Sequence, residues 1–471
     1  MNIRTDLAQS AVEAAGAGPG SSMGAVLDTT DARDWVALDL TVRRLWVLPS
    51  TDWLRAGDPA PDEPSLAVAL CHPDGRIRQA ALTSPGAAAL LPLVAVRCAD
   101  WVAPVREVAR AVLRDALPGA TPEVLGAVAA VILRVAQRRH GGSAEELLED
   151  ILQDDAIADV LRGSEDRAAR RLGHRIAIER GRLSPADLAR IAARDHDIVV
   201  QDLCADAALA RTRDGGEHGE IVRLLLGARQ ARVRAAGVTA LSRTGDTGRA
   251  TAFLADRSGL VRACARWVLR QHGVEPLPHY RSLCASPDVS PGAAAGLGEC
   301  GSAADAGLLR PLLAHPAVAV RARAVWALRM LDAIEPDRLL PLLDDPSAAV
   351  VREVALALTP TAARLPEEWL HRRLATDRPH YVRTAAFRLL AAHGTAAQLR
   401  CFLTLLDDAD PGLSARARAA LHGWGPADTA EVYAALPPAE RAHLDALLDR
   451  AQASLGKEPL NRLRWYLGAP R

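Results

Sequence analysis

Arginine is the residue type whose spacing in this chain points most clearly to a repeated chemical role. Seven arginines each follow a β-branched residue: Arg78, Arg106, Arg234, Arg262, Arg321, Arg352 and Arg383. An acid lies six or seven positions before many of them. Asp345, for example, precedes Arg352 by seven positions and Asp377 precedes Arg383 by six. A guanidinium at this spacing can pair with a turn acid or donate to the carbonyls of the turn. We therefore predict a structural role for these arginines, with a ladder of anion-binding groups as the alternative.

The sequence contains no motif that predicts catalysis. The run GSSMG at 20–24 matches a nucleophile elbow in letters, but no strand precedes it. The Gly-Lys pair at 456–457 lacks the rest of a phosphate-binding loop, and HExxH is absent. The Asp-His-Asp run at 195–197 has metal-ligand residue types, yet it occupies a position where other repeats carry turn acids. We predict that the chain is not an enzyme and holds neither a metal nor another cofactor.

The elements that carry these arginines recur along the chain. Successive motif arginines are 28, 128, 28, 59, 31 and 31 residues apart, which corresponds to a period of about 30.5 residues. Pro291 is expected to fill the missing register between Arg262 and Arg321. A Leu-rich segment precedes each arginine and an Ala-rich segment follows, as in 308–316 and 320–328. Each unit is predicted to be a helix, a turn and a second helix, which must stack on its neighbours to bury its apolar face.

These repeats resemble those of the HEAT-repeat family, in the short form called PBS-lyase-like repeats. The resemblance covers about residues 65–425 and implies an all-α, α-α superhelix of about twelve helix-turn-helix repeats. It implies little about activity, because HEAT arrays serve many roles. Between Arg106 and Arg234 the motif is missing, although Arg170 and Gln201 lie near the expected register.

Composition suggests how the ends of the repeat array are closed. Residues 1–34 are rich in Ala, Gly and Ser and are predicted to form a flexible leader. Residues 35–64 are expected to supply a capping helix and a linker, with Trp35 and Trp46 on its apolar stripe. The solenoid is expected over 65–427, with an irregular, acidic part around 118–165, and capping helices over 428–471. The acidic segment 145–159 is predicted to be a solvated face, with a docking surface for a basic partner as the alternative.

Helical geometry predicts which residues of the second helices face a ligand. At about 100° per residue, positions one, five and eight after the motif arginine point away from the first helix. In HEAT-like arrays this face lines the concave surface. Exposed Trp and Arg are typical of binding hot spots. The predicted partner-binding residues are Trp267, Arg270, Glu299, Trp326, Arg329 and Arg388, with Gly292 and Gly296 as a shallow floor. The alternative is that each tryptophan packs between neighbouring second helices.

The overall composition narrows the class of protein. Of the 471 residues, 49% are apolar but only 3% are aromatic, which favours helices over strands. The seven cysteines form no CxxC pair, so we expect buried thiols in a reducing compartment. No apolar stretch approaches the ~20 residues of a membrane span, and no secretory signal is evident. We predict a cytoplasmic location without membrane contact.

The predicted function is a non-enzymatic protein–protein interaction scaffold that recognises a partner on its concave face. The first alternative is a nucleic-acid-binding protein, or one like the alkylpurine DNA glycosylases of HEAT-like fold. The balance of 57 basic and 57 acidic residues makes nucleic acid the less favoured partner. The second alternative is a lyase-type accessory subunit. A deoxyhypusine hydroxylase-like di-iron site is disfavoured, because none of the 13 histidines is followed by Glu.

Overall fold

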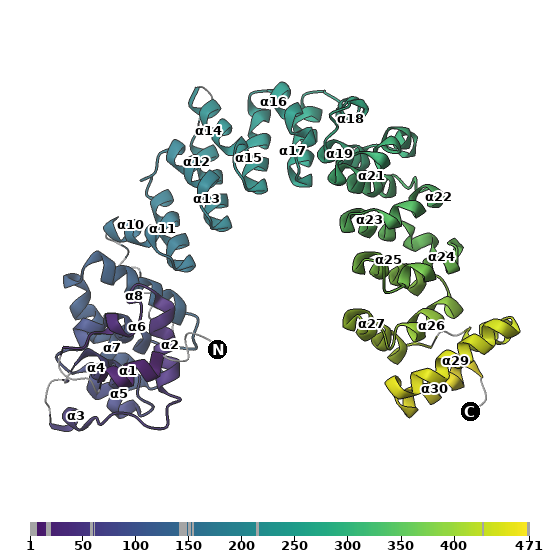
Figure 1. The fold of residues 1–471 in the computed structure, drawn as a ribbon. Helices are drawn as coiled ribbons and strands as arrows, with labels where there is room; N and C mark the ends of the chain where they lie inside the picture. Colours follow the sequence, from purple (N-terminus) through teal and green to yellow (C-terminus); the bar gives the residue numbers. More distant parts are fainter. Residues whose placement is uncertain are drawn as a thin grey trace. The chain divides into compact units, whose positions relative to one another are not determined.

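A computed structural model describes residues 7–15, 20–56, 60, 62–140, 148, 152, 155–212, 216–425 and 428–468. Within these ranges all regular secondary structure is helical, which confirms the predicted all-α class (Figure 1). Helical hairpins follow one another as in HEAT-repeat solenoids. The chain divides into two compact units, Met1–Gly237 and Val238–Arg471.

The N-terminal unit begins with helices that cover the first repeats. These are α1 (Leu7–Ala15), α2 (Ala32–Val42) and α3 (Asp52–Ala56). The hairpins are α4/α5 (Glu63–Leu70, Gly75–Leu82), α6/α7 (Leu91–Arg97, Ala103–Ala116), α10/α11 (Asp155–Gly163, Arg167–Glu179), α12/α13 (Pro185–Arg194, Ile198–Arg211) and α14/α15 (Gly216–Leu226, Ala231–Ala240), with α8 (Pro122–Val135) between the second and third. One apolar cluster runs from Ala8 to Ala169, because each Leu- and Ala-rich face packs on the next.

The prediction of a flexible leader is wrong for the described residues of 1–34. Helix α1 packs on α2 and α4, and Ala8 and Ala11 are buried there. The backbone N–H of Met23 donates to the Glu63 carboxylate at 3.0 Å. Small side chains allow helices to approach closely, so an Ala-rich composition is compatible with packing. Trp35 is buried as expected, whereas Trp46 follows the end of α2 and is fully exposed.

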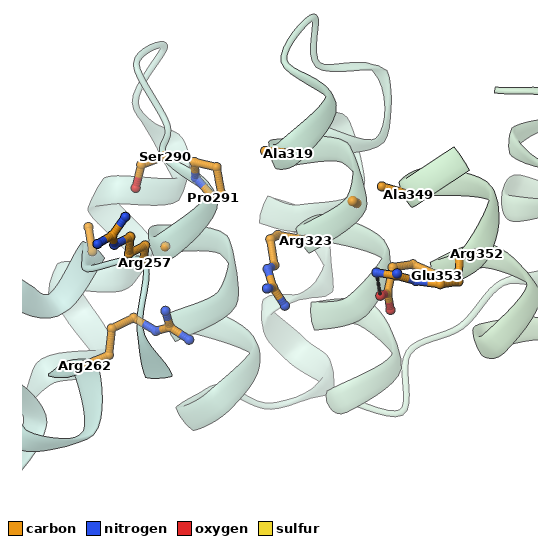
Figure 2. A pocket seen from close by; sticks show the side chains of 12 residues that line it. Arg257, Arg262, Ser290, Pro291, Ala319, Arg323, Ala349, Arg352 and Glu353 are labelled. Carbon is orange, nitrogen blue, oxygen red and sulfur yellow. Dashed lines mark hydrogen bonds and ion pairs between the residues drawn. The ribbon is translucent and has the colours of Figure 1, made fainter. Parts of the chain in front are cut away.

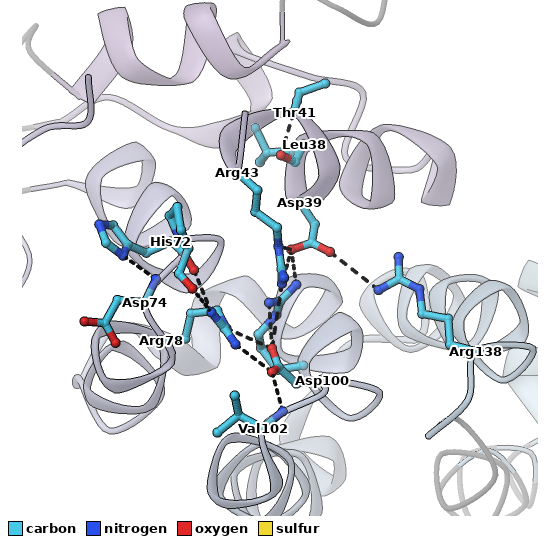
Figure 3. A network of polar contacts seen from close by, with 12 residues as sticks. Leu38, Asp39, Thr41, Arg43, His72, Asp74, Arg78, Asp100, Val102 and Arg138 are labelled. Carbon is cyan, nitrogen blue, oxygen red and sulfur yellow. Dashed lines mark hydrogen bonds and ion pairs between the residues drawn. The ribbon is translucent and has the colours of Figure 1, made fainter. Parts of the chain in front are cut away.

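Buried charges tie the capping helix α2 to the first two repeats (Figure 3). Asp39 of α2 pairs with Arg97 of α6, and Arg97 also donates to Asp100 at 2.9 Å. Arg78 of α5 donates to both carboxylate oxygens of Asp100 at 2.8 and 2.7 Å. The Arg78 guanidinium lies over the Trp101 ring, 4.4 Å from the ring centroid. Because these charged groups are buried, each requires its partners, and the network fixes how the cap sits on the repeats.

The C-terminal unit continues the same pattern. Its hairpins are α16/α17 (Thr247–Ala252, Gly259–Gln271), α18/α19 (Pro276–Ala285, Pro291–Cys300), α20/α21 (Ala306–Leu309, Val318–Met330), α22/α23 (Pro336–Leu339, Ala348–Leu358), α24/α25 (Glu367–His371, His380–Ala391) and α26/α27 (Thr395–Thr404, Pro411–His422). Helices α19, α21, α23 and α25 contact one another in sequence and form one layer (Figure 1). Helices α28 (Thr429–Ala435), α29 (Pro438–Leu455) and α30 (Lys457–Leu467) close the unit.

The motif arginine is the fourth residue of the second helix of its repeat. There it contacts the interhelical turn of its own repeat and that of the next repeat. Arg321 Nη1 donates to the carbonyls of His315 and Pro316 at 2.9 and 3.0 Å. Its Nε and Nη2 donate to Asp345, in the next turn, at 2.8 and 3.0 Å. Arg78 makes equivalent contacts with His72, Pro73 and Asp100. The guanidinium therefore holds its own turn and the turn of the following repeat in register.

The other motif positions make part of this contact set. Arg106, Arg234 and Arg262 donate to the carbonyl six residues earlier, at 2.7 to 3.0 Å. Arg383 pairs with Asp408, and Arg170 donates to Asp195 at 2.9 Å. Gln201 takes the same position and donates to the Asp195 carbonyl. These contacts support a structural role for the position, including the two residues that the motif itself does not include.

Two register assignments need correction. The fourth residue of α23 is Val351, which is buried, so Arg352 lies one position further on, with 69% of its side chain exposed. The fourth residue of α19 is Ala294, not Pro291, which is the first. Both errors arise because the sequence was aligned on a letter pattern, whereas the helix start determines which side chain reaches the turn.

Some residues of the predicted acidic segment lie outside the described residues, namely Glu145, Glu146, Glu149, Asp150 and Asp154. Asp159, on α10, is described and pairs with Arg162 at 2.7 Å.

The described part of the chain contains no single helix with the length and apolar composition of a membrane span. One bent pair, Gly75–Leu82 with Ala87–Arg97, meets those criteria when its two parts are joined, but it bends by 107°.

Candidate binding groove on the second helices of the C-terminal unit

Helix α17 carries its predicted binding residues on the surface. Trp267 is 45% exposed, and the Arg270 side chain is 51% exposed. Arg270 lies 3.6 Å from Glu275, an ion pair that solvent screens. Arg388 of α25 is also exposed. These three side chains are available to a partner.

Helix α21 does not present its tryptophan in the same way. Trp326 is only partly exposed, and its ring lies 3.3 Å from where a Cβ on Gly298 of α19 would be. The Arg323 guanidinium lies 5.7 Å from the centroid of that ring. Arg329 lies 3.9 Å from Glu353 on the next second helix. Trp326 therefore packs between neighbouring second helices, which is the alternative that the sequence left open.

The predicted glycine floor is wrong for Gly296, whereas Gly292 does line a groove on these helices. A Cβ on Gly292 would lie 2.0 Å from the carbonyl oxygen of Ala255, and one on Gly296 would lie 1.9 Å from the Tyr280 ring. Both glycines are buried and let α19 approach its neighbours closely. With Ala294 as the fourth residue, Gly296 packs against Tyr280 of α18, whereas Gly292 lines a groove at the start of α19. The displayed position five residues later is then Glu299.

Glu299 is committed to contacts within the protein. Arg266 donates to it at 2.6 Å and Arg262 donates to both of its oxygens, one at 3.2 Å. Burial works to raise the pKa of Glu299, but the hydrogen bonds from Arg262 and Arg266 outweigh it and hold the pKa below its usual range. The carboxylate thus stays ionised, and the prediction that it contacts a partner is not supported by these bonds.

A groove of about 430 Å³ lies along the N-terminal ends of three successive second helices (Figure 2). Its walls include Pro291 of α19, Ala319 of α21 and Ala349 of α23, all within the first two residues of their helices. The N–H groups of a first helical turn have no partners within the helix, and they give that end a partial positive charge. The backbone alone therefore favours anionic groups in the groove.

The side chains of the groove add to this positive charge. Its lining includes Arg257, Arg262, Arg323 and Arg352 against a single acid, Glu353. Arg257, Arg323 and Arg352 are exposed. They come from three of four successive repeats, because the α18/α19 repeat contributes no arginine to the lining. Arg262 is already paired with Glu299, and Glu353 lies 3.4 Å from Arg352. The groove is suited to carboxylate or phosphate groups, which arginine binds through two parallel hydrogen bonds.

Two groove residues lie outside the positions that the repeat motif predicts to face a ligand, and a third is predicted among the structural arginines. Arg257 lies in the turn before α17, and Arg323 lies two residues after the motif arginine, outside the positions considered. Arg352 was assigned to the structural set. Once α23 is numbered from Val351, Arg352 occupies the first displayed position, so a correct helix start would have identified it.

Comparisons with known proteins give matches among solved structures alone. No family model matches the chain, and no curated protein matches it. It is similar to Kap95p, described with RanGDP, at 15% identity over 99% of this chain and 66% of that chain, with a TM-score of 0.41. Kap121p bound to Pho4p matches at 15% identity over 84% of this chain and 53% of that chain, with a TM-score of 0.34. Importin beta matches at 13% identity over 98% of this chain and 64% of that chain, with a TM-score of 0.31. The chain spans about half to two thirds of the length of these proteins.

Proposed function

We propose that this protein is a non-enzymatic interaction scaffold that binds an acidic segment of a partner protein in the groove of α17 to α23. The observation that carries the proposal is the set of exposed guanidinium groups of Arg257, Arg323 and Arg352, which line one groove and come from three of four successive repeats. Charge complementarity of this kind steers association and fixes the register of the bound chain.

The repeat spacing limits the sequence that such a groove accepts. Packed helices lie about 8–10 Å apart, and an extended chain rises about 3.3 Å per residue. Three residues of an extended segment therefore span one repeat. Acidic side chains that are six and then three residues apart would meet Arg257, Arg323 and Arg352 in turn, because the α18/α19 repeat contributes no arginine. Trp267 and Arg270 on α17 and Arg388 on α25 belong to the same set of second helices and are proposed to extend the contact surface.

Several finer features belong to this proposal. The repeats are proposed to be of the short PBS-lyase-like type, since the motif recurs at about 30 residues. A cytoplasmic location is supported by the seven cysteines, which are all free thiols. The C-terminal helices α28 to α30 are proposed as a cap, because Leu444, Leu448 and Leu463 bury their side chains there.

The test uses a fluorescein-labelled decapeptide with Glu at positions 1, 7 and 10 and the same peptide with Gln at those positions. We expect the protein to bind the Glu peptide and to lose at least tenfold in affinity when Arg257, Arg323 and Arg352 are all changed to Gln. The matched control changes Arg338, Arg364 and Arg372, which are exposed on other elements, and should bind like the unmodified protein.

A labelled DNA duplex is measured in parallel at low and moderate salt. Duplex binding that needs the three groove arginines, without peptide binding, would replace this proposal with the nucleic-acid alternative. If the groove variant and the control variant lose the same affinity for the Glu peptide, total charge, and not the groove, governs binding.

A further inference from the structure

A second cavity, of about 600 Å³, lies in the N-terminal unit among α10, α11 and α12. It is separate from the groove proposed above and from the buried network around Asp39. Its lining includes Arg162 of α10, Arg170 and His174 of α11, and Arg190 and Arg194 of α12. The cavity is widely open to solvent, and its volume lies within the range of sites for small molecules.

The charges in this cavity are unbalanced. Four arginines line it, whereas Asp159 and Asp195 are its acids. Arg170 donates to Asp195 at 2.9 Å, and Arg162 donates to Asp159 at 2.7 Å. Both acids are thus already paired. Arg190 pairs with Asp187 at 2.6 Å. Arg194 is exposed and has no ion pair with any described residue. The lining carries a net positive charge.

Three buried nitrogen atoms in the lining side chains have no hydrogen-bond partner among the described residues. They are Arg162 Nε, Arg170 Nε and His174 Nδ1. His174 is 4% exposed, and its Nε2 lies 3.9 Å from Asp195. A buried donor without an acceptor costs about 1–3 kcal/mol, so such atoms are rare and require an explanation. The two guanidinium donors, together with the positive charge of the lining, favour a group rich in acceptors.

We propose that this cavity binds a phosphate monoester of a small molecule. A phosphate group carries negative charge and several acceptor oxygens, which matches both the excess of guanidinium groups and the buried donors. Arg194 contributes charge from α12, and Arg162 from α10. The cavity is larger than one phosphate, so the rest of the molecule lies against the wall that includes Ile191.

The probes are inorganic phosphate and glycerol 2-phosphate, with sodium chloride at matched ionic strength as the reference. We expect both phosphates to bind the full-length protein in calorimetry, and Arg194→Gln to weaken binding at least tenfold. Arg175→Gln is the control, because Arg175 is exposed on α11 and does not line the cavity. Tighter binding of glycerol 2-phosphate supports the ester, and equal binding of both would reduce the ligand to free phosphate and overturn the ester assignment.

A second measurement follows the ring nitrogens of ¹⁵N-labelled histidine by NMR. Phosphate should shift the His174 resonance, assigned with a His174→Gln variant, and leave it unmoved in Arg194→Gln. Absence of binding above the chloride reference, or equal binding by both arginine variants, would overturn the site. Neither outcome bears on the acidic-peptide groove, which lies in the other unit.

Discussion

Arg321 and Arg352 differ by one helical position, and this difference should determine what each contributes to stability. Arg321 is largely buried and binds two carbonyls and Asp345, so Arg321→Gln leaves the Asp345 carboxylate without its partner. We expect a loss of about 3–5 kcal/mol in the free energy of unfolding, the usual effect of breaking a buried ion pair. Arg352→Gln should change it by no more than about 0.5 kcal/mol. Denaturant unfolding measures both.

If the two variants lose equal stability, the corrected register of α23 is wrong. If neither loses stability, the turn-to-turn contact does not hold the repeats together.

His174 should make folding sensitive to mild acid. Burial lowers its pKa, and nearby Arg162 and Arg170 add to this, although Asp195 and Asp197 oppose it. Below the ordinary value of about 6.5 the unfolded chain therefore binds a proton that the folded chain does not. Stability is highest above this pH and falls as the pH is lowered toward the folded pKa, by at most about 1.4 kcal/mol per pH unit.

The measurement compares the unmodified protein with His174→Gln between pH 7.5 and 5.5. The stability difference between the two should change with pH in the stated direction. A difference that stays constant would mean that His174 is protonated equally in both states.

At the scale of single elements, glycine is used in α19 for close approach. Gly296→Ala places a methyl group 1.9 Å from the ring of Tyr280, which is fully buried and has no space to move into. We expect a loss of at least about 1–3 kcal/mol from overpacking. Gly307→Ala in α20 is the control, since nothing lies within 4 Å of its added carbon. Alanine there should be neutral or stabilise by up to about 1 kcal/mol.

Thermal unfolding of the two variants provides the comparison. If both variants unfold at the same midpoint temperature, α19 can shift without a loss of stability, and its glycines are not required for packing.

The helix pairs could be predicted from the sequence, but which faces they expose could be predicted only in part. The Leu-rich and Ala-rich segments indicate hairpins, because only stacking buries both faces. The letter pattern at Val351-Arg352 does not reveal where α23 begins, and a single position rotates the helix by about 100°. The position of Trp326 was equally undetermined, because it depends on Gly298 of the preceding repeat. The groove arginines come from three repeats, so no single repeat could identify them.

At the scale of the whole molecule, a net charge of zero conceals local separation of charge. Four arginines face one acid in the groove of the C-terminal unit, and four face two paired acids in the cavity of the N-terminal unit. The neutral total argued against anionic partners, yet binding responds to the local field within about a Debye length, roughly 8–10 Å. Net charge is therefore a poor guide to the partners of a chain whose repeats each build their own surface.

The same neighbour-only contacts should make the response to damage local. Helix α19 contacts α17, α18 and α21, together with the short turn of helix that precedes α17. In an array of this kind stability is a sum of repeat and interface terms, so a defect in one repeat weakens mainly the adjacent ones. Gly296→Ala should therefore increase hydrogen exchange in α17 to α21 and leave α4 to α8 unchanged. Exchange followed by mass spectrometry measures each segment in one sample. A uniform increase across both units would mean that the chain opens as one cooperative body, and the stack would then not be the unit of its stability.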